Sequence, residues 1–394
     1  MENLITPDDN SSRKVTILGA TGSIGQSTID LLIRNSEKYT VEFLTAQSNV
    51  ELLASQAIKL GVRGAVIGDS NKYNTLKAAL SGSGIKVAAG SEAIVEAAQE
   101  SADFVMAGIV GAAGLKPTMA AVRSGKTIGL ANKECLVCAG ELMMREVSNA
   151  GATLLPVDSE HNAIFQVFDF EHPESIKKII LTASGGPFRE KTYIQMKNAT
   201  PKEAVAHPNW DMGAKISVDS ATMMNKGLEM IEAFHLFPIS VNQIDVLVHP
   251  QSVIHSMVSY IDGSVLAQLG SPDMRTPIAY SLAWPERLQS PSPVLDLAEL
   301  GRLDFEKPDE KRFSALRIAR EAMIAGGSAP IVLNASNEIA VQAFLNKIIR
   351  LTDIPSIVEE IMSVSSFNAP GNIDEVIEID EAIRAKTLAL IKSK

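Results

Sequence analysis

Short apolar runs alternate with helical patterns through the first third of the chain. The runs that read as strands are KVTILGA (14–20), VEFLTA (41–46), GAVIGD (64–69), DFVMAGIV (103–110) and KTIGLA (126–131). Such alternation is typical of parallel strands joined by helical crossovers. It predicts an α/β domain with a Rossmann-like, doubly wound parallel sheet over residues 1–157. ATLLPVDS (152–159) is expected to form a further strand that carries its polar end into the next domain.

The pattern changes in the middle of the chain. KKIILTASGGPF (177–188) reads as a strand that enters a glycine-rich turn, and residues 245–271 contain two strands joined by Asp-Gly at 262–263, a hairpin signal. A capping-box pattern opens a short helix at Thr200. These features predict a central α+β catalytic domain over residues 158–285.

The last part of the chain is helical by period. Residues 286–312 form a connection rich in proline and serine, and from Phe313 onward apolar positions recur at helical spacing between Gly, Pro and Asn breaks. We therefore expect a C-terminal bundle of three or four amphipathic helices over residues 313–394.

Composition narrows the class of protein. The chain has 394 residues, of which 46% are hydrophobic and 21% charged, and its net charge is −10. No apolar run approaches the ~20 residues that a membrane helix needs, and no basic cluster points to nucleic acid or an anionic membrane. The start resembles neither a secretory signal nor a transit peptide, so we expect a cytoplasmic protein whose partners are small molecules.

The two cysteines, Cys135 and Cys138, form a CxxC. This spacing is compatible with a redox pair or half of a zinc site. A second CxxC or a paired histidine motif is missing from the sequence, and the segment continues as an apolar helix pattern. We expect two ordinary helix residues in a reducing compartment.

A glycine-rich loop follows the first strand. Gly19, Gly22 and Gly25 are three residues apart and open a helix, which suits a tight turn that approaches a pyrophosphate. The segment TAQSN (45–49) has no acid to hold ribose hydroxyls, which favours NADP over NAD. It has no Arg or Lys either, so the neutral donors Ser48 and Asn49 are the expected phosphate contacts.

Two carboxylates interrupt an apolar stretch at LLPVDSEHNAIFQ (154–166). In an extended strand Asp158 and Glu160 would share one face. They could be surface charges, an acid and base pair, or ligands of a hard cation such as Mg²⁺ or Mn²⁺. Glu229 supplies a third carboxylate, which favours the metal site.

The segment ISVDSATMMNKGLEMIEAF predicts a helix with Asp219 or Ser220 as its N-cap. Helical spacing gathers Asn225, Lys226 and Glu229 within one turn, and serine, amide and cation together suit a phosphate. Ser184, in the glycine-rich turn, adds a hydroxyl. His207, Trp210 and Gly213 lie in a loop that is either a mobile lid or a static loop anchored by the tryptophan.

Seven motifs occur in the order found in one enzyme family: GATGSIG, ANKE, PVDSEHNAIFQ, SGGPFR, HPNWDMGAKISVDSATMMNKGLE, HPQSVIHSMV and GSPDMRTPIAYSLAWP. From about Lys14 onward the chain resembles the 1-deoxy-D-xylulose-5-phosphate reductoisomerases. Members of this family are homodimers that use NADPH and Mg²⁺, Mn²⁺ or Co²⁺ to make 2-C-methyl-D-erythritol 4-phosphate, an isoprenoid precursor.

The resemblance implies a role for each matching residue. The metal ligands are Asp158, Glu160 and Glu229. The substrate phosphate is held by Ser184, Ser220, Asn225 and Lys226. The residues near the reacting end are Lys133, Ser159 and His207, with Glu160 beside them, while Trp210 and Met274 pack on the substrate. The cofactor contacts are Thr21, Gly22, Ser23, Ile24, Gln47, Ser48, Asn49, Asn132, Glu134 and Gly213.

The implied catalytic residues are Lys133, Glu160 and His207. The carbon skeleton rearranges by retro-aldol cleavage and re-addition or by direct migration, and hydride reduction follows. The alternative is another NAD(P)-dependent sugar-phosphate reductase or epimerase. The chain departs from many relatives at Gln47, Ser48 and Ala214, where they carry Gly, a basic residue and Arg.

Overall fold

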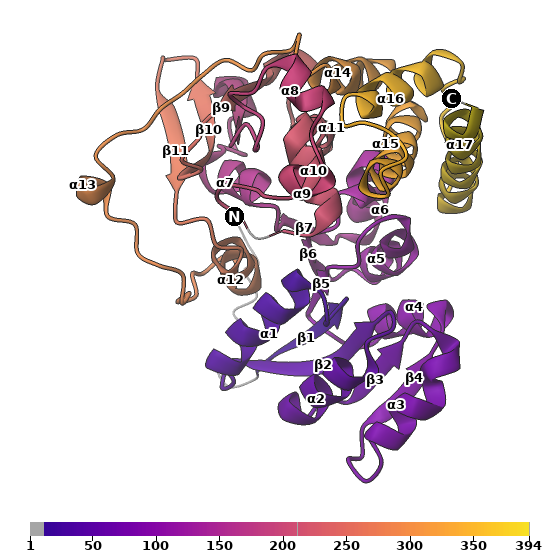
Figure 1. Cartoon of the computed structure of the whole chain (residues 1–394). Coiled ribbons are helices and arrows are strands. Elements are labelled where there is room, and N and C mark those ends of the chain that lie inside the picture. Colours follow the sequence, from indigo (N-terminus) through magenta and orange to yellow (C-terminus); the bar gives the residue numbers. More distant parts are fainter. Residues whose placement is uncertain (1–11, 211, 394) are drawn as a thin grey trace. The chain divides into compact units, whose positions relative to one another are not determined.

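The computed structural model describes residues 12–210 and 212–393 (Figure 1). It divides into two compact units. Unit 1 comprises Met1–Asn132, Arg145–Val157 and Met274–Pro291. Unit 2 comprises Lys133–Met144, Asp158–Asp273 and Ser292–Lys394.

Unit 1 is built on a seven-stranded sheet with the order β4-β3-β2-β1-β5-β6-β7, in which every neighbouring pair is parallel. Its strands are β1 (Arg13–Leu18), β2 (Tyr39–Ala46), β3 (Gly64–Ile67), β4 (Lys86–Ala89), β5 (Phe104–Ala107), β6 (Thr127–Leu130) and β7 (Thr153–Pro156). The order reverses after β4, as in a doubly wound sheet, so the predicted α/β fold is confirmed.

The helices of unit 1 follow its strands along the chain. They are α1 (Ser23–Arg34), α2 (Val50–Leu60), η1 (Ser70–Lys72), α3 (Tyr73–Ala79), α4 (Ser91–Gln99), η2 (Ala112–Gly114), α5 (Leu115–Arg123) and α12 (Arg275–Ala283). The central strands are apolar and buried: Val15, Ile17, Phe104 and Val105 are all 0% exposed. Burial on both faces explains why these strands read as continuous apolar runs.

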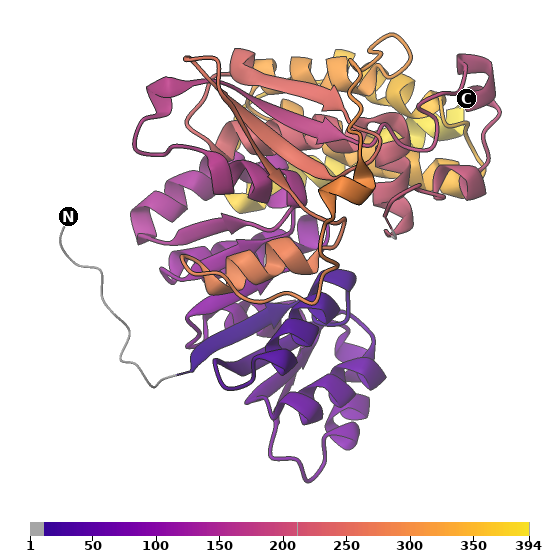
Figure 2. The same cartoon turned by 90° about the vertical axis from the view of Figure 1, so that its left-hand side faces the viewer.

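Unit 2 contains a four-stranded sheet with the order β11-β10-β8-β9. Its strands are β8 (Ile176–Ala183), β9 (Ile244–Val248), β10 (Ile254–Tyr260) and β11 (Val265–Leu269). Strands β10 and β11 form the predicted hairpin, with Tyr260 accepting from the Gly263 amide at 3.2 Å. Helices α7 (Ser159–Val167) and α11 (Met224–Leu236) contact this sheet, and the C-terminal helices lie behind it in Figure 2.

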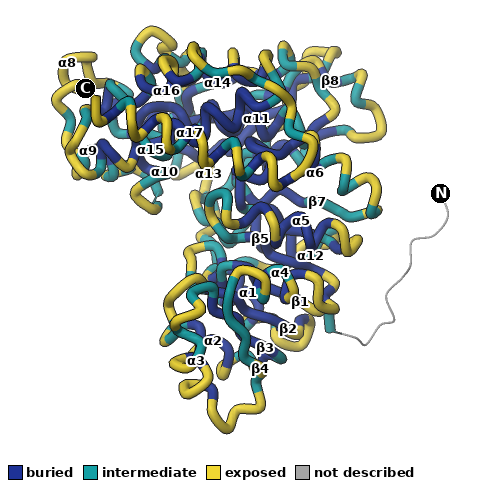
Figure 3. The backbone as a smooth tube through the Cα atoms, turned by 90° about the vertical axis from the view of Figure 1, so that its right-hand side faces the viewer, coloured by how far each residue is buried: buried dark blue, intermediate teal, exposed yellow. Residues whose placement is uncertain are grey.

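The remaining helices of unit 2 include the predicted C-terminal set. Before the connection they are η3 (Pro173–Ser175), α8 (Tyr193–Lys197), α9 (Pro201–Ala204), α10 (Ala214–Thr222) and η4 (Val241–Gln243). After it they are α13 (Leu297–Leu300), α14 (Ala315–Ala325), α15 (Ala329–Leu345), α16 (Asp353–Ser363) and α17 (Ile373–Ser393). Helices α11 and α15 are largely dark blue in Figure 3, which reflects their burial inside the unit.

Helix α6 (Glu134–Ala150) belongs to both units. Its backbone leaves helical geometry at Ala139, where φ is −135° and ψ is 26°. Cys135 and Cys138 lie in its buried first half as free thiols, which confirms that both are helix residues.

Two local predictions need correction. The strand expected through Ser159 ends at Pro156, and Asp158 instead precedes α7 as its N-cap residue. Asp158 and Glu160 therefore do not share one face of a strand. The helix expected to begin at Asp219 or Ser220 begins after Met223, because both residues lie inside α10. Within the described residues, every helix is too short or too polar to cross a bilayer.

Candidate active site

Three carboxylates converge in unit 2 although they are distant in sequence. Asp158 and Glu160 stand at the start of α7, and Glu229 lies in the second turn of α11. One oxygen from each residue lies within 4.8 Å of the others. Oxygen donors at this spacing match the preferences of a hard divalent cation.

Two buried lysines contact these carboxylates. Lys133 donates to Asp158 Oδ2 at 3.0 Å and to Asn225 Oδ1 at 2.7 Å. Lys226 donates to Glu160 Oε1 at 3.0 Å and also pairs with Glu229. In this arrangement Lys226 binds the carboxylates predicted as metal ligands, and the same contacts place its ammonium at the centre of the site.

Burial and neighbouring charges shift the pKa values of the ionisable groups in this cluster. Burial, together with Glu229, raises the pKa of Glu160 to about 8. Burial also disfavours the ionised form of Asp158, but the Lys133 charge outweighs it and holds the pKa of Asp158 well below its usual range. The pKa of Lys133 is raised, because Asp158 and Glu229 outweigh its desolvation.

Two further residues complete the cluster and were not predicted. His161 is buried, and its Nε2 lies 2.9 Å from the carbonyl oxygen of Glu229. Its Nδ1 lies 3.8 Å from Glu232 Oε2, and burial raises the pKa of Glu232 well above its usual value. Asp158, His161 and Glu232 thus form a second group of closely spaced donor atoms. The i,i+3 spacing from Glu229 places Glu232 on the same side of α11, a signal that sequence alone could have used.

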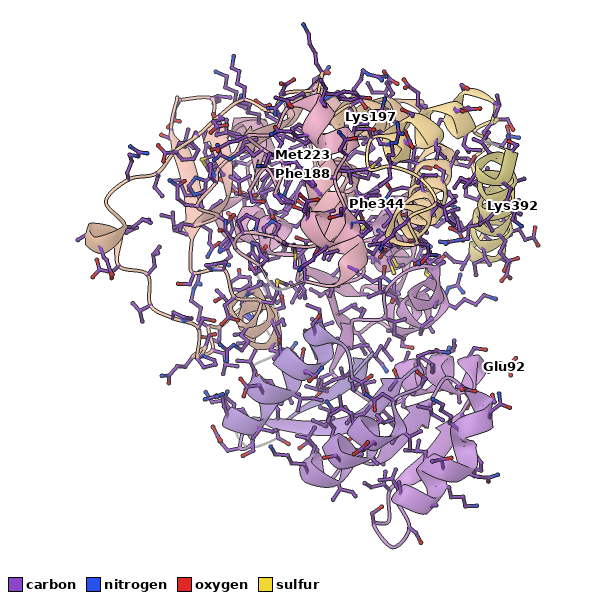
Figure 4. The ribbon with its side chains drawn as sticks, in the orientation of Figure 1. Glu92, Phe188, Lys197, Met223, Phe344 and Lys392 are labelled. Carbon is purple, nitrogen blue, oxygen red and sulfur yellow. The ribbon has the colours of Figure 1, made fainter. Side chains whose placement is uncertain are left out.

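The phosphate candidates lie around the break between α10 and α11. Met223, labelled in Figure 4, adopts a left-handed conformation with φ 64° and separates the two helices. Ser220 lies before the break and Asn225 after it. A Cβ on Gly186 would lie 2.7 Å from the carbonyl oxygen of Ser220, so the glycine turn after β8 packs directly on this junction. Ser184 Oγ accepts from the Gly186 amide at 3.1 Å.

His207 is held as a neutral imidazole. Its Nδ1 accepts from the amides of Asn209 and Trp210 at 3.2 and 3.0 Å, which leaves the proton on Nε2. Nε2 lies 2.8 Å from Ser184 Oγ. Burial lowers the pKa of His207, in agreement with a neutral ring. The contact joins the predicted lid to the phosphate candidates.

The loop that carries His207 is also tied to the turn after β9. Asn209 Nδ2 donates to the carbonyl oxygen of Pro250 at 2.7 Å and to Ser252 Oγ at 3.0 Å. The rings of Trp210 and His255 lie 6.2 Å apart. Ser159 donates to Glu160 at 2.7 Å, so its side chain faces the carboxylates rather than away from them.

The glycine loop of unit 1 has the geometry that its spacing predicts. Gly19 has φ +87°, and a Cβ there would lie 2.8 Å from the carbonyl oxygen of Gly108. A Cβ on Gly25 would lie 2.4 Å from the Gly19 oxygen. No side chain caps α1, whose first turn, Ser23 onward, carries no acid. Its amide groups suit a pyrophosphate.

The other predicted cofactor contacts are divided between the units. Asn49 caps α2 by accepting from the Leu52 amide at 3.1 Å. Asn132, also in unit 1, donates to the Gly111 oxygen at 3.0 Å. Glu134 and Gly213 belong to unit 2, where Gly213 is the N-cap of α10. Met274, the expected substrate contact, precedes α12 in unit 1.

Models of one enzyme family match most of the chain. The family model 1-deoxy-D-xylulose 5-phosphate reductoisomerase matches residues 15–140. The C-terminal domain models of the same enzyme match residues 154–237 and 269–386. The chain belongs to the 1-deoxy-D-xylulose 5-phosphate reductoisomerase family.

Similar reductoisomerases span nearly the whole chain. The protein from Zymomonas mobilis subsp. mobilis is 56% identical over 381 residues, which cover 97% of this chain and 98% of that protein. The protein from Rhodospirillum centenum is 59% identical over 372 residues, with coverages of 94% and 92%.

Solved structures of this family share the fold. The Z. mobilis reductoisomerase in complex with NADPH aligns with a TM-score of 0.93 at 54% identity, covering 97% of this chain and 99% of that one. A reductoisomerase in complex with NADPH, fosmidomycin and magnesium aligns with a TM-score of 0.92 at 45% identity, with coverages of 96% and 98%.

Proposed function

We propose that this chain converts 1-deoxy-D-xylulose 5-phosphate into 2-C-methyl-D-erythritol 4-phosphate, with NADPH as reductant and a divalent metal ion. The convergence of Asp158, Glu160 and Glu229 carries the proposal, because three oxygen ligands on two buried helices are the donor set that such chemistry needs. Relatives that bind NADPH, magnesium and fosmidomycin support it.

The charge of the cluster fits a divalent cation. Four carboxylates, those of Asp158, Glu160, Glu229 and Glu232, face the two ammonium groups of Lys133 and Lys226. When all of these groups are ionised, two negative charges remain. Mg²⁺ would balance them, and Mn²⁺ and Co²⁺ accept the same oxygen ligands. A bound metal ion supplies Lewis acidity at the substrate carbonyl.

The protein side chains then divide the remaining tasks. Lys133 and His207 are the groups that hold protons near the reacting end of the substrate, and Ser159 orients Glu160 by its hydrogen bond. The residues assigned to the substrate phosphate are Ser184, Ser220, Asn225 and Lys226. Trp210 and Met274 are assigned to packing on the substrate, with the loop around His207 acting as the lid that excludes water.

We assign the cofactor to the glycine loop and the segment that follows β2. The proposed contacts are Thr21, Gly22, Ser23, Ile24, Gln47, Ser48, Asn49, Asn132, Glu134 and Gly213. In functional terms, residues 1–157 bind NADPH, 158–285 form the catalytic domain, 286–312 connect, and 313–394 form the supporting bundle. We expect the enzyme to act in the cytoplasm.

A homodimer is expected to form at the edge of the unit 2 sheet. Strand β11 is the outer strand of that sheet, and Val265 and Leu266 are 51% and 49% exposed. Val294, in the connection, is 95% exposed. An apolar edge strand invites pairing with a second chain. Leu266→Lys should give a monomer by light scattering, whereas an unchanged mass would exclude this edge as the interface.

The test of the proposed function is oxidation of NADPH in the presence of 1-deoxy-D-xylulose 5-phosphate. Chelation should abolish the reaction, and Mg²⁺ or Mn²⁺ should restore it. Glu229→Gln should lose activity, whereas Glu174→Gln, at an exposed glutamate of unit 2, should not. Oxidation that persists in chelator, or that needs a different sugar phosphate, would favour the alternative of another sugar-phosphate reductase or epimerase.

A further inference from the structure

The segment expected to recognise the 2′-phosphate of NADPH has no positive charge of its own. Strand β2 ends at Ala46, and Gln47, Ser48 and Asn49 follow it. These residues offer neutral donors, and Asn49 already uses its side-chain oxygen to cap α2. A phosphate monoester carries nearly two negative charges, so neutral donors alone leave it poorly compensated.

The tertiary structure brings a second loop to this segment. Strands β2 and β3 are parallel neighbours, so their carboxyl ends meet at one edge of the sheet. The Gly68 amide donates to the Ala46 oxygen and the Asp69 amide to the Gln47 oxygen, both at 2.8 Å. The two loops therefore run together for several residues beyond their strands.

This second loop carries a lysine to the phosphate segment. Lys72 is the last residue of η1, and its Nζ donates to the carbonyl oxygen of Ser48 at 2.8 Å. Within the part of the chain that the structure describes, the ammonium thus pairs with an uncharged carbonyl group. An ammonium has three hydrogens to donate, so this contact positions Lys72 without using up its capacity.

The acidic residue of the same loop is engaged elsewhere. Asp69 Oδ1 accepts from the amide of Asn71 at 3.0 Å and from its side chain at 3.1 Å. These bonds hold the carboxylate against its own turn. Lys72 as a whole is half-buried, but its hydrogen bond to Ser48 is exposed, so the ammonium is accessible to a ligand at the edge of the sheet.

We propose that Lys72 binds the 2′-phosphate of NADPH together with Ser48 and Asn49, and that this contact gives the enzyme its preference for NADPH over NADH. The inference rests on the proposed function only in that NADPH must bind at the edge of unit 1. Lys72 thus supplies from the β3 loop the charge that the β2 loop lacks.

Direct binding tests the proposal without turnover. Isothermal titration of the full-length protein should be made with NADPH, NADH, 2′,5′-ADP and 5′-AMP. For Lys72→Met we expect affinity for NADPH and 2′,5′-ADP to fall about tenfold, the typical loss for a hydrogen bond to a charged group, while NADH and 5′-AMP change by less than about twofold. Lys72→Arg should retain affinity to within about threefold, because it keeps the charge.

A matched control separates this contact from general surface charge. Lys59→Met removes an exposed lysine from the last turn of α2, about 15 Å along the helix from Asn49, and should leave all four affinities unchanged. In turnover, Lys72→Met should raise KM for NADPH and leave kcat and KM for the sugar phosphate unchanged.

The outcomes distinguish this inference from the proposed function. If Lys72→Met weakens NADPH and NADH equally, or weakens neither, Lys72 does not read the 2′-phosphate and the inference is wrong while the enzyme assignment stands. If the unaltered protein binds neither NADPH nor 2′,5′-ADP, the proposed function itself fails.

Discussion

Glu160 should couple metal binding to the release of a proton. Its side chain is 20% exposed, accepts from Ser159 at 2.7 Å and lies 3.0 Å from the ammonium of Lys226. Despite that lysine, burial and the carboxylate of Glu229 raise the pKa of Glu160 to about 8. A carboxylate must lose its proton to bind a metal ion, so proton and metal compete for this oxygen.

The size of the pH effect on metal affinity follows from the pKa of Glu160. At pH 7 a group with a pKa of about 8 is ionised in about one molecule in eleven, and each further pH unit below costs about 1.4 kcal/mol of binding free energy. Affinity for Mn²⁺ should therefore rise about 50-fold between pH 6 and pH 8 and level off above that. Affinity rises rather than falls with pH because the protonated form of Glu160 cannot serve as a metal ligand.

Calorimetry in buffers of different ionisation enthalpy measures both the affinity for Mn²⁺ and the number of protons released on binding. We expect about 0.9 proton released per Mn²⁺ bound at pH 7. In Glu160→Gln the affinity should be weaker and the dependence on pH much smaller, whereas Glu174→Gln should behave as the unaltered protein. Affinity independent of pH, or binding without proton release, would refute the reasoning.

Three further changes test the packing and the ligand assignment. Gly227→Ala should lower the free energy of unfolding by about 1–2 kcal/mol, because its Cβ would lie 2.6 Å from that of Ala319, and helix propensity returns only about 1 kcal/mol. Chemical denaturation measures the loss, which Ala319→Gly should relieve, and an unchanged midpoint would contradict close helix packing. Asn337→Leu removes the 2.8 Å bond from Asn337 Nδ2 to the buried Asp219 and should cost about 1–3 kcal/mol by the same method, whereas a neutral effect would show that the carboxylate finds another donor. Glu229→Gln should reduce turnover by at least about 100-fold with NADPH affinity unchanged by titration, and equal loss of both would place Glu229 in the cofactor site.

Local signals in the sequence were enough for much of the fold. The alternation of strands and helices, the Asp-Gly hairpin at 262–263, the capping box at Thr200 and the C-terminal helices all appear in the structure. Each depends on residues within a few positions of one another. Strand β4 was missed because KVAA is short and only partly buried, so it carries little apolar pattern.

Helix boundaries near the site were harder to predict. Residues 152–159 were expected to stay extended, but Asp158 is an N-cap and the following acidic turn starts α7. The break at Met223 was also missed, because a left-handed methionine has no local signature and is held by the packing around it. At Gly227 the tertiary packing explains a glycine inside a helix, because a Cβ there would lie 2.6 Å from that of Ala319 in α14.

The sequence by itself determined which chemical groups the protein contains and which of them lie within one helical turn, as Asn225, Lys226 and Glu229 do. It also determined the glycine loop and the absence of an acid after β2, because these depend on neighbours in the chain. Only the tertiary structure decided that Lys133 meets Asp158, and that Lys72 reaches Ser48. Those contacts depend on which strands and helices become neighbours, and that choice minimises the free energy of the whole packed chain rather than of any one segment.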